Sequence, residues 1–495
     1  MPNLMPMVYP RVRSAVSAGK VKVVVLAGGQ GERLGPITRP SVNRSALPKP
    51  LVNLGQIPLI NFSLEPIKAL GIKDIHITTC YLSEEIEKRI VQNPIYGISM
   101  DPHREDPDKP LDTAGAVNYV FNMHQWGQDR DATVIVLSAD IAHNMDIGPM
   151  LNFHLENKAA ATIVLNDVPW TDVNRFGTVR LDDMPRREQY RTMEEFEDAV
   201  GAYLMANRGG AKKIAEFKEK ASREAALSNL NNSSIYFFNA GFLADLSSLI
   251  TPKDRGDKKP PYRSLSDYGK HIFPALTGRA DHISRNYPHY PKFLELVDKV
   301  KQGEYGFFGA VWPEKNPWGK PSYWKDLGTP LALWEANIKD VLGGRLYTWL
   351  GPAKGIWWPT EYGWVGNHVS IGKNVKISRS PLEEQSTPHR PIGAIIGHYV
   401  TIEDGVKIKN SIIGDRVVLK EGVEVENSII CGGDQESATI ITGGLKVINS
   451  IVLGGKYPTN YAQLASIQHG LAYRLPIIDL ARDFGGLVVD PMFRE

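Results

Sequence analysis

The first half of the chain carries short, continuous apolar runs that alternate with helical patterns. VKVVVLA (21–27) is followed at once by GGQGERLG, and further apolar runs occupy residues 72–80, 132–140, 159–168 and 232–243. Runs of this length and β-branched content are typical of strands buried on both faces. Residues 60–70, between the first two runs, have the apolar spacing of a helix. This alternation predicts an α/β domain whose sheet is flanked by helices.

The pattern changes near residue 365, where apolar residues begin to recur every six positions. Ile396, Ile402 and Ile408 show this spacing, and it returns 17 residues later, where IGHYVTIEDGVKIKNSI aligns with IGDRVVLKEGVEVENSI. Such hexads are typical of a β-helix, in which each coil must stack on its neighbour to bury its apolar face. A small sandwich of alternating strands is the alternative, which two copies in register disfavour. Residues 379–392 and 431–439 are expected to be loops that leave the coil.

Three segments fit neither pattern. Residues 252–263 are expected to be an exposed loop, and the last forty residues have helical spacing in QLASIQHGLAYRL and IIDLARDF. Helices there would cap the β-helix or meet a second subunit. Residues 186–211 predict an amphipathic helix that covers the sheet or a partner, with an apolar face formed by Met193, Phe196, Val200, Tyr203 and Leu204.

Composition and charge exclude several classes of protein. The 495 residues are 42% hydrophobic and 23% charged, which is typical of a globular protein with more than one domain. With 57 Lys+Arg against 55 Asp+Glu, the chain lacks the basic excess expected of a nucleic-acid or membrane-surface protein. Its two cysteines, Cys80 and Cys431, cannot build a disulfide framework. No apolar run reaches the roughly 18 residues of a membrane helix, and the start is not a secretory signal, so we expect a cytoplasmic protein.

The glycine-rich turn after the first apolar run is a candidate phosphate site. Glycine lets backbone N–H groups approach phosphate closely, and the turn contains Gly28, Gly29 and Gly31. It is neither a Walker motif nor a dinucleotide fingerprint, because no Gly-Lys-Ser/Thr follows and Leu34 occupies the expected third glycine. Arg33 and Lys49 can add positive charge, which favours phosphate binding over a merely tight strand–helix connection.

At this point LAGGQGERLGPIT…LPKPLV resembles the opening motif of the sugar-1-phosphate nucleotidyltransferases, the nucleotide-sugar pyrophosphorylases. Further segments follow in that family's order: PLDTAGAV (110–117), VLSADIAHNMD (136–146), VPWTDVNRFGTV (168–179), IAEFKEK (214–220) and YWKDLGTPLALWEAN (323–337). Several segments are most similar to ADP-glucose pyrophosphorylases, whereas PKPLVNLGQIPLINFSLEPIKALGI is more similar to GDP-mannose pyrophosphorylases. The base and the sugar therefore stay open.

The resemblance implies a Rossmann-like nucleotidyltransferase domain with a mostly parallel sheet, followed by a left-handed parallel β-helix. The predicted segments are an N-terminal extension (1–20), a catalytic domain (21–345), a linker (346–364), the β-helix (365–455) and a C-terminal tail (456–495). The partners this implies are a nucleoside triphosphate and a sugar 1-phosphate. Because a solenoid leaves open ends, we also expect a homo-oligomer, dimer or tetramer, that uses the β-helix; neither nucleic acid nor membrane is expected as a partner.

The implied reaction is attack of a sugar-1-phosphate oxygen on the α-phosphorus of the triphosphate, with release of pyrophosphate and no covalent intermediate. Because two anions must meet, Mg²⁺ and cationic side chains would neutralise their charge. By resemblance, the catalytic residues are Arg33, Lys49, Asp140 and Asp326, and the two aspartates bind Mg²⁺. The nucleotide-binding positions are Gly28, Gly29, Gly31, Arg33, Asp112, Thr113 and Gly115, and the sugar-phosphate-binding positions are Gly177, Glu219 and Lys220.

Three positions depart from the family's pattern. Glu32 stands where Thr is usual, Ala221 replaces a proline, and Asp112 replaces a glycine in the base-contacting segment. The Asp112 carboxylate would either block a base or accept hydrogen bonds from one such as guanine. Because several segments are most similar to ADP-glucose pyrophosphorylases, we expect a glucose-1-phosphate adenylyltransferase-like enzyme. These departures keep two alternatives open, a mannose-1-phosphate guanylyltransferase-like enzyme and a catalytically weak regulatory homologue. A bifunctional enzyme with acyl transfer on the β-helix would need a general base such as His398.

Overall fold

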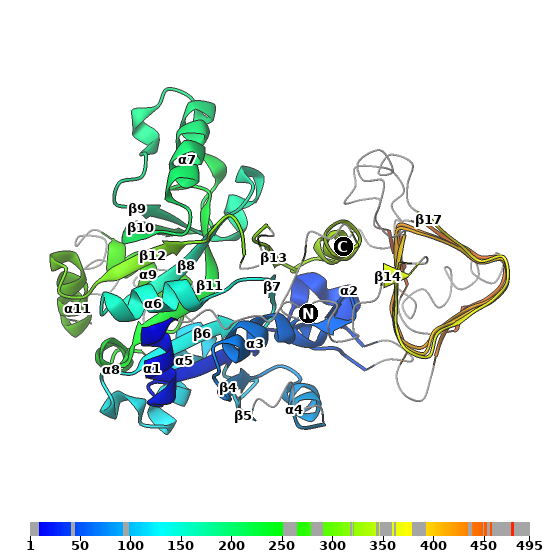
Figure 1. Cartoon of the computed structure of the whole chain (residues 1–495), viewed down its shortest axis with the longest axis horizontal. Coiled ribbons are helices and arrows are strands. Elements are labelled where there is room, and N and C mark those ends of the chain that lie inside the picture. Colours follow the sequence, from blue (N-terminus) through cyan, green and yellow to red (C-terminus); the bar gives the residue numbers. More distant parts are fainter. Residues whose placement is uncertain are drawn as a thin grey trace.

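The structure is a computed structural model of the chain, and in Figure 1 an α/β domain lies beside a triangular coil. Among the residues that it describes, no helix is both long and apolar enough to cross a membrane. The described residues are 9–40, 45–92, 99–250, 265–278, 291–316, 319, 321–342, 346, 359–360, 363–378, 393–433, 438–448, 450–452, 456–457 and 477–479.

The α/β domain is built on one nine-stranded sheet in the order β5-β4-β1-β6-β11-β8-β12-β10-β9. Its strands are β1 (Val21–Leu26), β4 (Asp74–Thr79), β5 (Ser99–Arg104), β6 (Thr133–Ser138), β8 (Ala161–Asp167), β9 (Gly177–Leu181), β10 (Ala211–Glu219), β11 (Leu230–Asn239) and β12 (Phe307–Val311). Four of the predicted strands are confirmed as β1, β4, β6 and β8. The fifth, predicted over 232–243, ends early, because Asn239 caps helix α8 (Ala240–Ser247) by accepting a hydrogen bond from the Phe242 N–H.

The sheet is mostly parallel, as predicted, but not wholly so, because β10 and β11 run antiparallel to all the other strands. β1 runs parallel to β4 and β6, and β12 runs parallel to β8. β11, however, is antiparallel to both β6 and β8, and β10 is antiparallel to β9 and β12. A continuous apolar run identifies a strand buried on both faces, as β11 is, but such burial does not fix the strand's direction.

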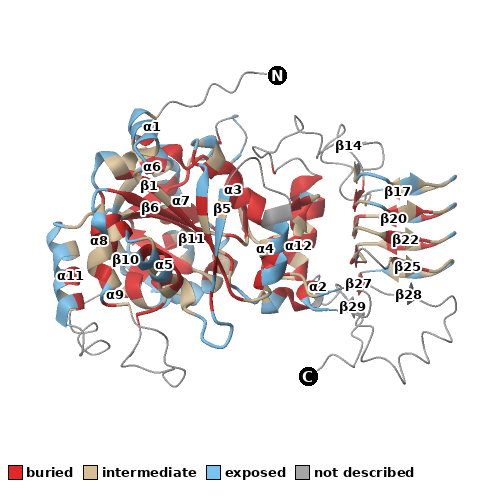
Figure 2. Ribbon diagram, turned by 90° about the horizontal axis from the view of Figure 1, so that it is seen from below, coloured by how far each residue is buried: buried red, intermediate tan, exposed pale blue. Residues whose placement is uncertain are grey.

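Helices cover both faces of the sheet (Figure 2), and two of the apolar clusters formed by buried residues include side chains of its strands and of these helices. Consecutive residues of β1 alternate between them, since Val24 joins one cluster whereas Val23 and Val25 join the other. The Val24 cluster contains side chains of α5 (Asp112–Met123), α8, α9 (Phe273–Thr277) and α11 (Pro291–Gln302). The other contains side chains of α1 (Pro10–Ser17), α3 (Ile60–Ala69), α4 (Ser83–Gln92) and α6 (Gly148–Glu156), so part of the expected N-terminal extension packs into the domain.

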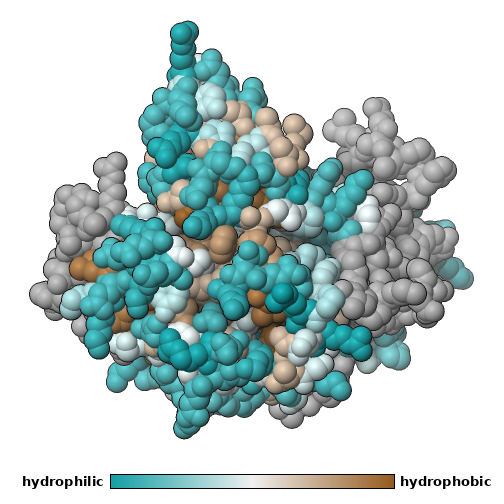
Figure 3. All heavy atoms as spheres, turned by 60° about the vertical axis from the view of Figure 1, so that its left-hand side comes forward, coloured by the Kyte–Doolittle hydropathy of each residue, from teal (hydrophilic) through white to brown (hydrophobic). Residues whose placement is uncertain are grey.

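The amphipathic helix predicted within 186–211 is confirmed as α7 (Met193–Asn207). It begins with a capping box, in which the Thr192 hydroxyl accepts from the Glu195 N–H. Its apolar face belongs to the Val24 cluster and is directed at this domain, through Phe196, Val200 and Leu204. The predicted loop 252–263 lies outside the described residues. In Figure 3 hydrophilic residues predominate on the face in view.

The second body, here called the coil domain, consists of three stacked parallel sheets that form the triangle in Figure 1. Ile396 pairs with Ile413, and Ile413 with Ile430, so the 17-residue register is confirmed and the sheets are consistent with the predicted β-helix. Its left-handedness stays a prediction. The first sheet contains β15 (Gly363–Val365), β18 (Ala394–Ile396), β21 (Ser411–Ile413), β24 (Ile429–Ile430) and β27 (Ser450–Val452). The second contains β16 (Ser370–Ile371), β19 (Thr401–Ile402), β22 (Val417–Leu419), β25 (Thr439–Ile441) and β28 (Lys456–Tyr457), and the third β17 (Lys376–Ser378), β20 (Lys407–Lys409), β23 (Glu424–Glu426) and β26 (Lys446–Ile448).

Antiparallel strands lie at both ends of the first sheet. β14 (Pro359–Thr360) pairs with β15, and β29 (Ile477–Asp479) pairs with β27. The helical prediction for IIDLARDF is therefore wrong at Ile477–Asp479, because the open edge of β27 offers these residues backbone partners. The predicted loop 379–392 and the helix predicted over QLASIQHGLAYRL lie outside the described residues, as do residues 434–437 of the second predicted loop.

The coil domain packs against the α/β domain through one shared apolar cluster. Leu333 of α12 (Pro330–Glu335) and Ile338 of the following π-helix (Ala336–Val341) join Ile395 and Ile429 in it. The Trp334 Nε1–H donates to a coil carbonyl, that of Asn410, at 2.8 Å. Because α12 begins shortly after Asp326, this contact connects the coil domain to the candidate site.

Candidate active site

Asp140 and Asp326 lie side by side although they are distant in the sequence. Asp140 comes two residues after the end of β6, and Asp326 is the last residue of β13 (Trp324–Asp326). β13 pairs antiparallel with β7 (Ile141–His143), and in this register Asp326 lies opposite Ile141. The short β7–β13 pair therefore carries the second carboxylate to the end of β6, at the carboxyl edge of the sheet.

The ammonium group of Lys49 lies between these carboxylates. Its Nζ is 2.7 Å from Asp140 Oδ2 and 3.0 Å from Asp326 Oδ1, and Lys49 is only 5% exposed. Burial acts to lower the pKa of Lys49, but the two carboxylates outweigh it and raise that pKa. Burial acts to raise the pKa of Asp140, but Lys49 and a hydrogen bond from the Ser138 hydroxyl hold it below its usual range. Lys49 and Asp140 are thus both charged near neutral pH.

Two arginines complete the cationic surroundings of Asp326. Arg33 Nη2 lies 3.3 Å from Asp326 Oδ2, and Arg175 Nη2 lies 3.2 Å from the same oxygen. Arg33 belongs to a 3₁₀ turn (Glu32–Leu34) directly after the glycine-rich turn, whereas Arg175 ends another (Trp170–Arg175). The Arg33 side chain is 61% exposed, so its guanidinium remains accessible to an anionic ligand.

A cavity of about 370 Å³ opens beside these charges. Gly28 and Gly29 form one wall together with Lys49 and Asp140. Gly31 lies outside the lining, and its φ of +65° and close approach to Lys49 account for the glycine: an added Cβ would be 3.1 Å from the Lys49 Cβ. The glycine-rich turn therefore lines the cavity through Gly28 and Gly29 and packs against Lys49 through Gly31.

The start of α5 forms the opposite wall through Asp112 and Thr113. Asp112 has a φ of +57°, and its Oδ2 accepts a hydrogen bond from the Ser266 hydroxyl at 2.9 Å. Gly115 is not among the lining residues of this cavity; its N–H donates to the Ser266 carbonyl at 3.1 Å. The structure thus places Asp112 and Thr113 at this cavity, whereas the Gly115 N–H binds the backbone of Ser266.

The predicted sugar-phosphate residues meet across the β9–β10 pair. Gly177 lies opposite Glu219, and a Cβ on Gly177 would come within 2.7 Å of the Glu219 Oε2. Burial, followed by repulsion from Asp267, raises the pKa of Glu219. Lys220 follows as an exposed residue with a φ of +48°. Asp267 also lines the 370 Å³ cavity, so this group lies next to it.

A family model described as nucleotidyl transferase matches residues 22–341. The chain belongs to the nucleotidyltransferase family. It is 25% identical to a glucose-1-phosphate adenylyltransferase of Bacillus cereus over 414 residues, which cover 79% of this chain and 86% of the relative. It is 28% identical to the glucose-1-phosphate adenylyltransferase of Bacillus subtilis over 328 residues, covering 64% and 66% of the two chains.

Family membership and these relatives together make the chain an enzyme of the sugar-1-phosphate nucleotidyltransferase class. A solved structure from Bacillus anthracis, described as a glucose-1-phosphate thymidylyltransferase, is 19% identical with a TM-score of 0.40 and covers 64% of this chain and 94% of its own.

Several residues of this candidate site were not predicted from the sequence. Arg175 lies inside the family-like segment VPWTDVNRFGTV, so that resemblance was a usable signal for it. Glu105 follows the end of β5 and lines the cavity, where burial raises its pKa. Its position at the carboxyl end of a strand was the only available signal. Ser138 lies inside the family-like segment VLSADIAHNMD, so the resemblance was equally a signal for it. Asp267 gains its role here from a distant partner, Glu219.

The glycine after β13 offers a test of the Arg33–Asp326 contact. A Cβ on Gly328 would lie 2.9 Å from both Arg33 Nη2 and Asp326 Oδ2, so Gly328→Ala must displace one of them. We expect kcat/KM for the triphosphate to fall about tenfold with little change in melting temperature. Gly201→Ala in α7 is the control, because nothing lies within 4 Å of its added Cβ. It should keep wild-type kinetics, and wild-type kinetics in Gly328→Ala would show that the contact is dispensable.

Proposed function

We propose that this nucleotidyltransferase makes a nucleoside diphosphate sugar and pyrophosphate from a nucleoside triphosphate and a sugar 1-phosphate, and that its substrates are ATP and glucose 1-phosphate. The observation that carries the proposal is the convergence of Asp140, Asp326 and Lys49 beside the cavity lined by the glycine-rich turn. The Bacillus relatives, both glucose-1-phosphate adenylyltransferases, support the choice of base and sugar.

The carboxylates of Asp140 and Asp326 suit Mg²⁺, which prefers one or two carboxylates together with phosphate oxygens and water. Both come from strand ends at one edge of the sheet, and their oxygens already converge on one cation, Lys49 Nζ. We propose that these two residues hold Mg²⁺. When bound, the ion would neutralise phosphate charge and orient the reacting groups.

The side chains of this chain have distinct parts in the proposed reaction. Lys49, Arg33 and Arg175 supply fixed positive charge where the two anionic substrates must meet, which favours the transition state electrostatically. Gly28 and Gly29 leave room for the triphosphate beside their backbone. On the other side, Glu219 and Lys220 are proposed to bind the sugar hydroxyls and the sugar phosphate.

Asp112 is the observation that favours a second candidate, a mannose-1-phosphate guanylyltransferase. Its carboxylate belongs to the cavity wall, and a carboxylate can accept hydrogen bonds from guanine N1–H and N2–H groups, which adenine lacks. In an adenylyltransferase, Asp112 would instead hold Ser266 in place, because its carboxylate accepts a hydrogen bond from the Ser266 hydroxyl.

A pyrophosphate-release assay over four nucleoside triphosphates and several sugar 1-phosphates tests these candidates. The proposal predicts the highest kcat/KM for ATP with glucose 1-phosphate. The highest value for GTP with mannose 1-phosphate would establish the second candidate. Release with no pair would favour the regulatory homologue, against which the intact set of Arg33, Lys49, Asp140 and Asp326 argues.

The acyltransferase alternative gains no support from His398. Its Nδ1 accepts a hydrogen bond from the Asn367 N–H at 2.9 Å, and the backbone N–H of His398 donates to Asp415 Oδ1 at 2.8 Å. His398 therefore joins successive turns of the coil domain, which is a structural use of this ring nitrogen.

The two substrates should respond to different cations. Lys220→Ala is expected to raise KM for the sugar 1-phosphate roughly tenfold with a smaller effect on the triphosphate, and Arg33→Ala should do the reverse. Steady-state kinetics with each substrate varied in turn measures both. Lys218→Ala is the control, because the Lys218 ammonium donates to the Ala225 carbonyl. The opposite pattern would mean that the two subsites have been exchanged.

We also propose that the enzyme is a dimer or tetramer with the coil domain in an interface. The first coil leaves apolar side chains only half-buried: Ile371 and Ile377 are intermediate in exposure, whereas Ile402 and Ile408 beneath them are each 1% exposed. Sedimentation velocity should therefore show an oligomer at micromolar concentration, and Ile377→Glu should weaken it while the exposed control Lys376→Glu does not. A wild-type monomer would contradict this prediction.

A further inference from the structure

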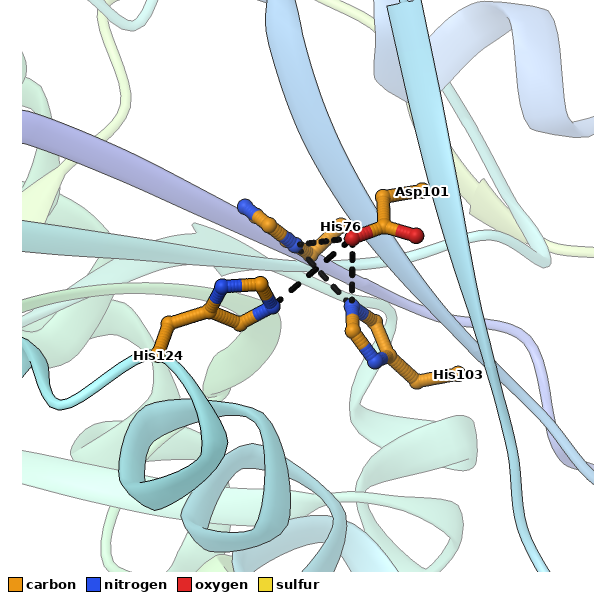
Figure 4. Close-up of side chains that lie close together, drawn as sticks. All are labelled: His76, Asp101, His103 and His124. Carbon is orange, nitrogen blue, oxygen red and sulfur yellow. Dashed lines mark hydrogen bonds and ion pairs between the residues drawn. The ribbon is translucent and has the colours of Figure 1, made fainter.

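Three histidines and one aspartate gather at the edge of the sheet, outside the active site (Figure 4). His76 lies on β4, Asp101 and His103 lie on β5, and His124 is the C-terminal cap of α5. One ring nitrogen of each histidine and one carboxylate oxygen all lie within 4.8 Å of one another. Four metal-binding atoms from three elements thus point at one centre.

The distances between these atoms are close to those of a tetrahedral site. Asp101 Oδ2 is 3.5 Å from His76 Nδ1, 3.5 Å from His103 Nε2 and 3.7 Å from His124 Nε2. His76 Nδ1 and His103 Nε2 are 3.0 Å apart. With metal–ligand distances near 2.0–2.1 Å, the edges of a zinc tetrahedron are about 3.3 Å long. Shifts of a few tenths of an ångström would bring these four of the six edges to that length, and the two edges between His124 and the other histidines are at most 4.8 Å long.

Hydrogen bonds within the cluster do not account for the positions of Asp101 Oδ2 and His124 Nε2. The distances from Asp101 Oδ2 to the three ring nitrogens exceed the usual N–H···O range of about 2.7–3.2 Å. His124 Nε2 is buried and has no hydrogen-bond partner, although a buried polar atom normally has one. A cation at the centre would satisfy this nitrogen and the carboxylate together.

The surroundings favour a metal that prefers imidazole. The Trp126 ring stacks on His124 with the centroids 5.6 Å apart and meets His76 edge-on at 5.0 Å, which holds both rings in place. The Asp101 side chain is 55% exposed and leaves a path from solvent.

We propose that His76, Asp101, His103 and His124 bind one Zn²⁺ ion in a tetrahedral site separate from the Mg²⁺ site proposed at Asp140 and Asp326. Three imidazoles and one carboxylate suit zinc, whereas Mg²⁺ and Ca²⁺ prefer oxygen ligands. A site with four protein ligands is closed and therefore structural.

The position of this zinc site gives it a task in the fold. It joins the edge strand β5 and its neighbour β4 to the end of α5, whose first residues, Asp112 and Thr113, line the active-site cavity. β5 leads directly to Glu105 in another part of the same wall. The ion would therefore hold together the elements that carry Asp112, Thr113 and Glu105, whichever nucleotide the cavity binds.

Metal analysis of the full-length protein tests the site. After treatment with a chelator and dialysis, the protein is titrated with Co²⁺ in excess Mg²⁺, and then with Zn²⁺. We expect one equivalent of Co²⁺ with the intense visible bands of tetrahedral cobalt, displaced by one equivalent of Zn²⁺. His124→Ala and His103→Ala should each weaken binding at least tenfold, whereas His368→Ala, an exposed histidine of the coil domain, should bind as wild type.

Thermal melting gives a second readout that does not depend on activity. Zn²⁺ should raise the melting temperature of the wild type and of His368→Ala but not of His124→Ala, because only a folded site binds the ion. His124 ends a helix and its side chain is 30% exposed, so this variant decides the question if His103→Ala fails to fold. Absence of tetrahedral cobalt bands, bands that persist in His124→Ala, or bands lost in Asp140→Asn would each overturn the proposal.

Discussion

Replacing Asp140 or Asp326 by asparagine is expected to lower kcat by about a hundred- to thousandfold while leaving the protein folded. Each substitution keeps the size of the side chain but removes one of the two negative charges proposed to hold Mg²⁺ on the phosphates. The fold should survive, because Lys49 retains one carboxylate partner in either variant. Asp326→Asn should have the larger effect on triphosphate use, since Arg33 and Arg175 also rest on that carboxylate.

Pyrophosphate release at limiting and saturating Mg²⁺ measures this effect, with melting temperature as the check on folding. Asp129→Asn is a matched control, because Asp129 is also paired with a lysine, Lys20, at 3.1 Å, but on the surface. It should behave as wild type. Turnover near the wild-type value in either active-site variant at limiting Mg²⁺ would remove Asp140 and Asp326 as the metal ligands.

The parts of the fold that were predictable are those in which local pattern and burial coincide. The apolar runs gave β1, β4, β6 and β8, and the hexads gave the 17-residue stacking of the coil domain. Strand direction was not predictable in this way, because β11 carries the same apolar signal as a parallel strand while running antiparallel to its neighbours. The helix predicted over Ile477–Asp479 was wrong for a related reason, because pairing with the edge of β27 makes these residues a strand.

In the candidate site too, residues in recognisable segments were predictable, whereas roles that depend on packing were not. Lys49, Asp140 and Asp326 were found because each stands in a segment that resembles the family, and the β7–β13 pair brings them together. Gly31 was assigned to the nucleotide, whereas its conformation and its closeness to Lys49 give it a place in the packing of the turn.

The histidine cluster carried no comparable signal. Its four ligands are spread over three elements, with no short repeat such as those of common zinc motifs. The pairing of β4 with β5, in which His76 lies opposite Asp101, brings three of them together, and the end of α5 adds His124.

Lys49→Met is expected to abolish turnover, by about a thousandfold or more, and at the same time to tighten the binding of Mg²⁺ to the substrate-free protein. The two carboxylates that Lys49 now neutralises would face each other without a cation, which is a better site for a divalent ion. The variant should also change the pH dependence. Lys49 holds the pKa of Asp140 below its usual range, so its removal must raise that pKa and shift the acidic limb of the pH–rate profile to higher pH.

Isothermal titration with Mg²⁺ and the pH dependence of residual kcat/KM measure the two effects independently. The sign is fixed by linkage: a carboxylate with a lowered pKa stabilises the folded protein above its unfolded-state pKa and loses that contribution as pH falls through the folded-state value. Lys49→Met should therefore lose less stability than the wild type between neutral and acidic pH. Lys20→Met, which breaks the exposed pair with Asp129, is the control and should show neither tighter Mg²⁺ binding nor a shifted profile. Unchanged Mg²⁺ affinity in Lys49→Met would mean that Asp140 and Asp326 are held apart by the rest of the fold, and that Lys49 acts on the substrate alone.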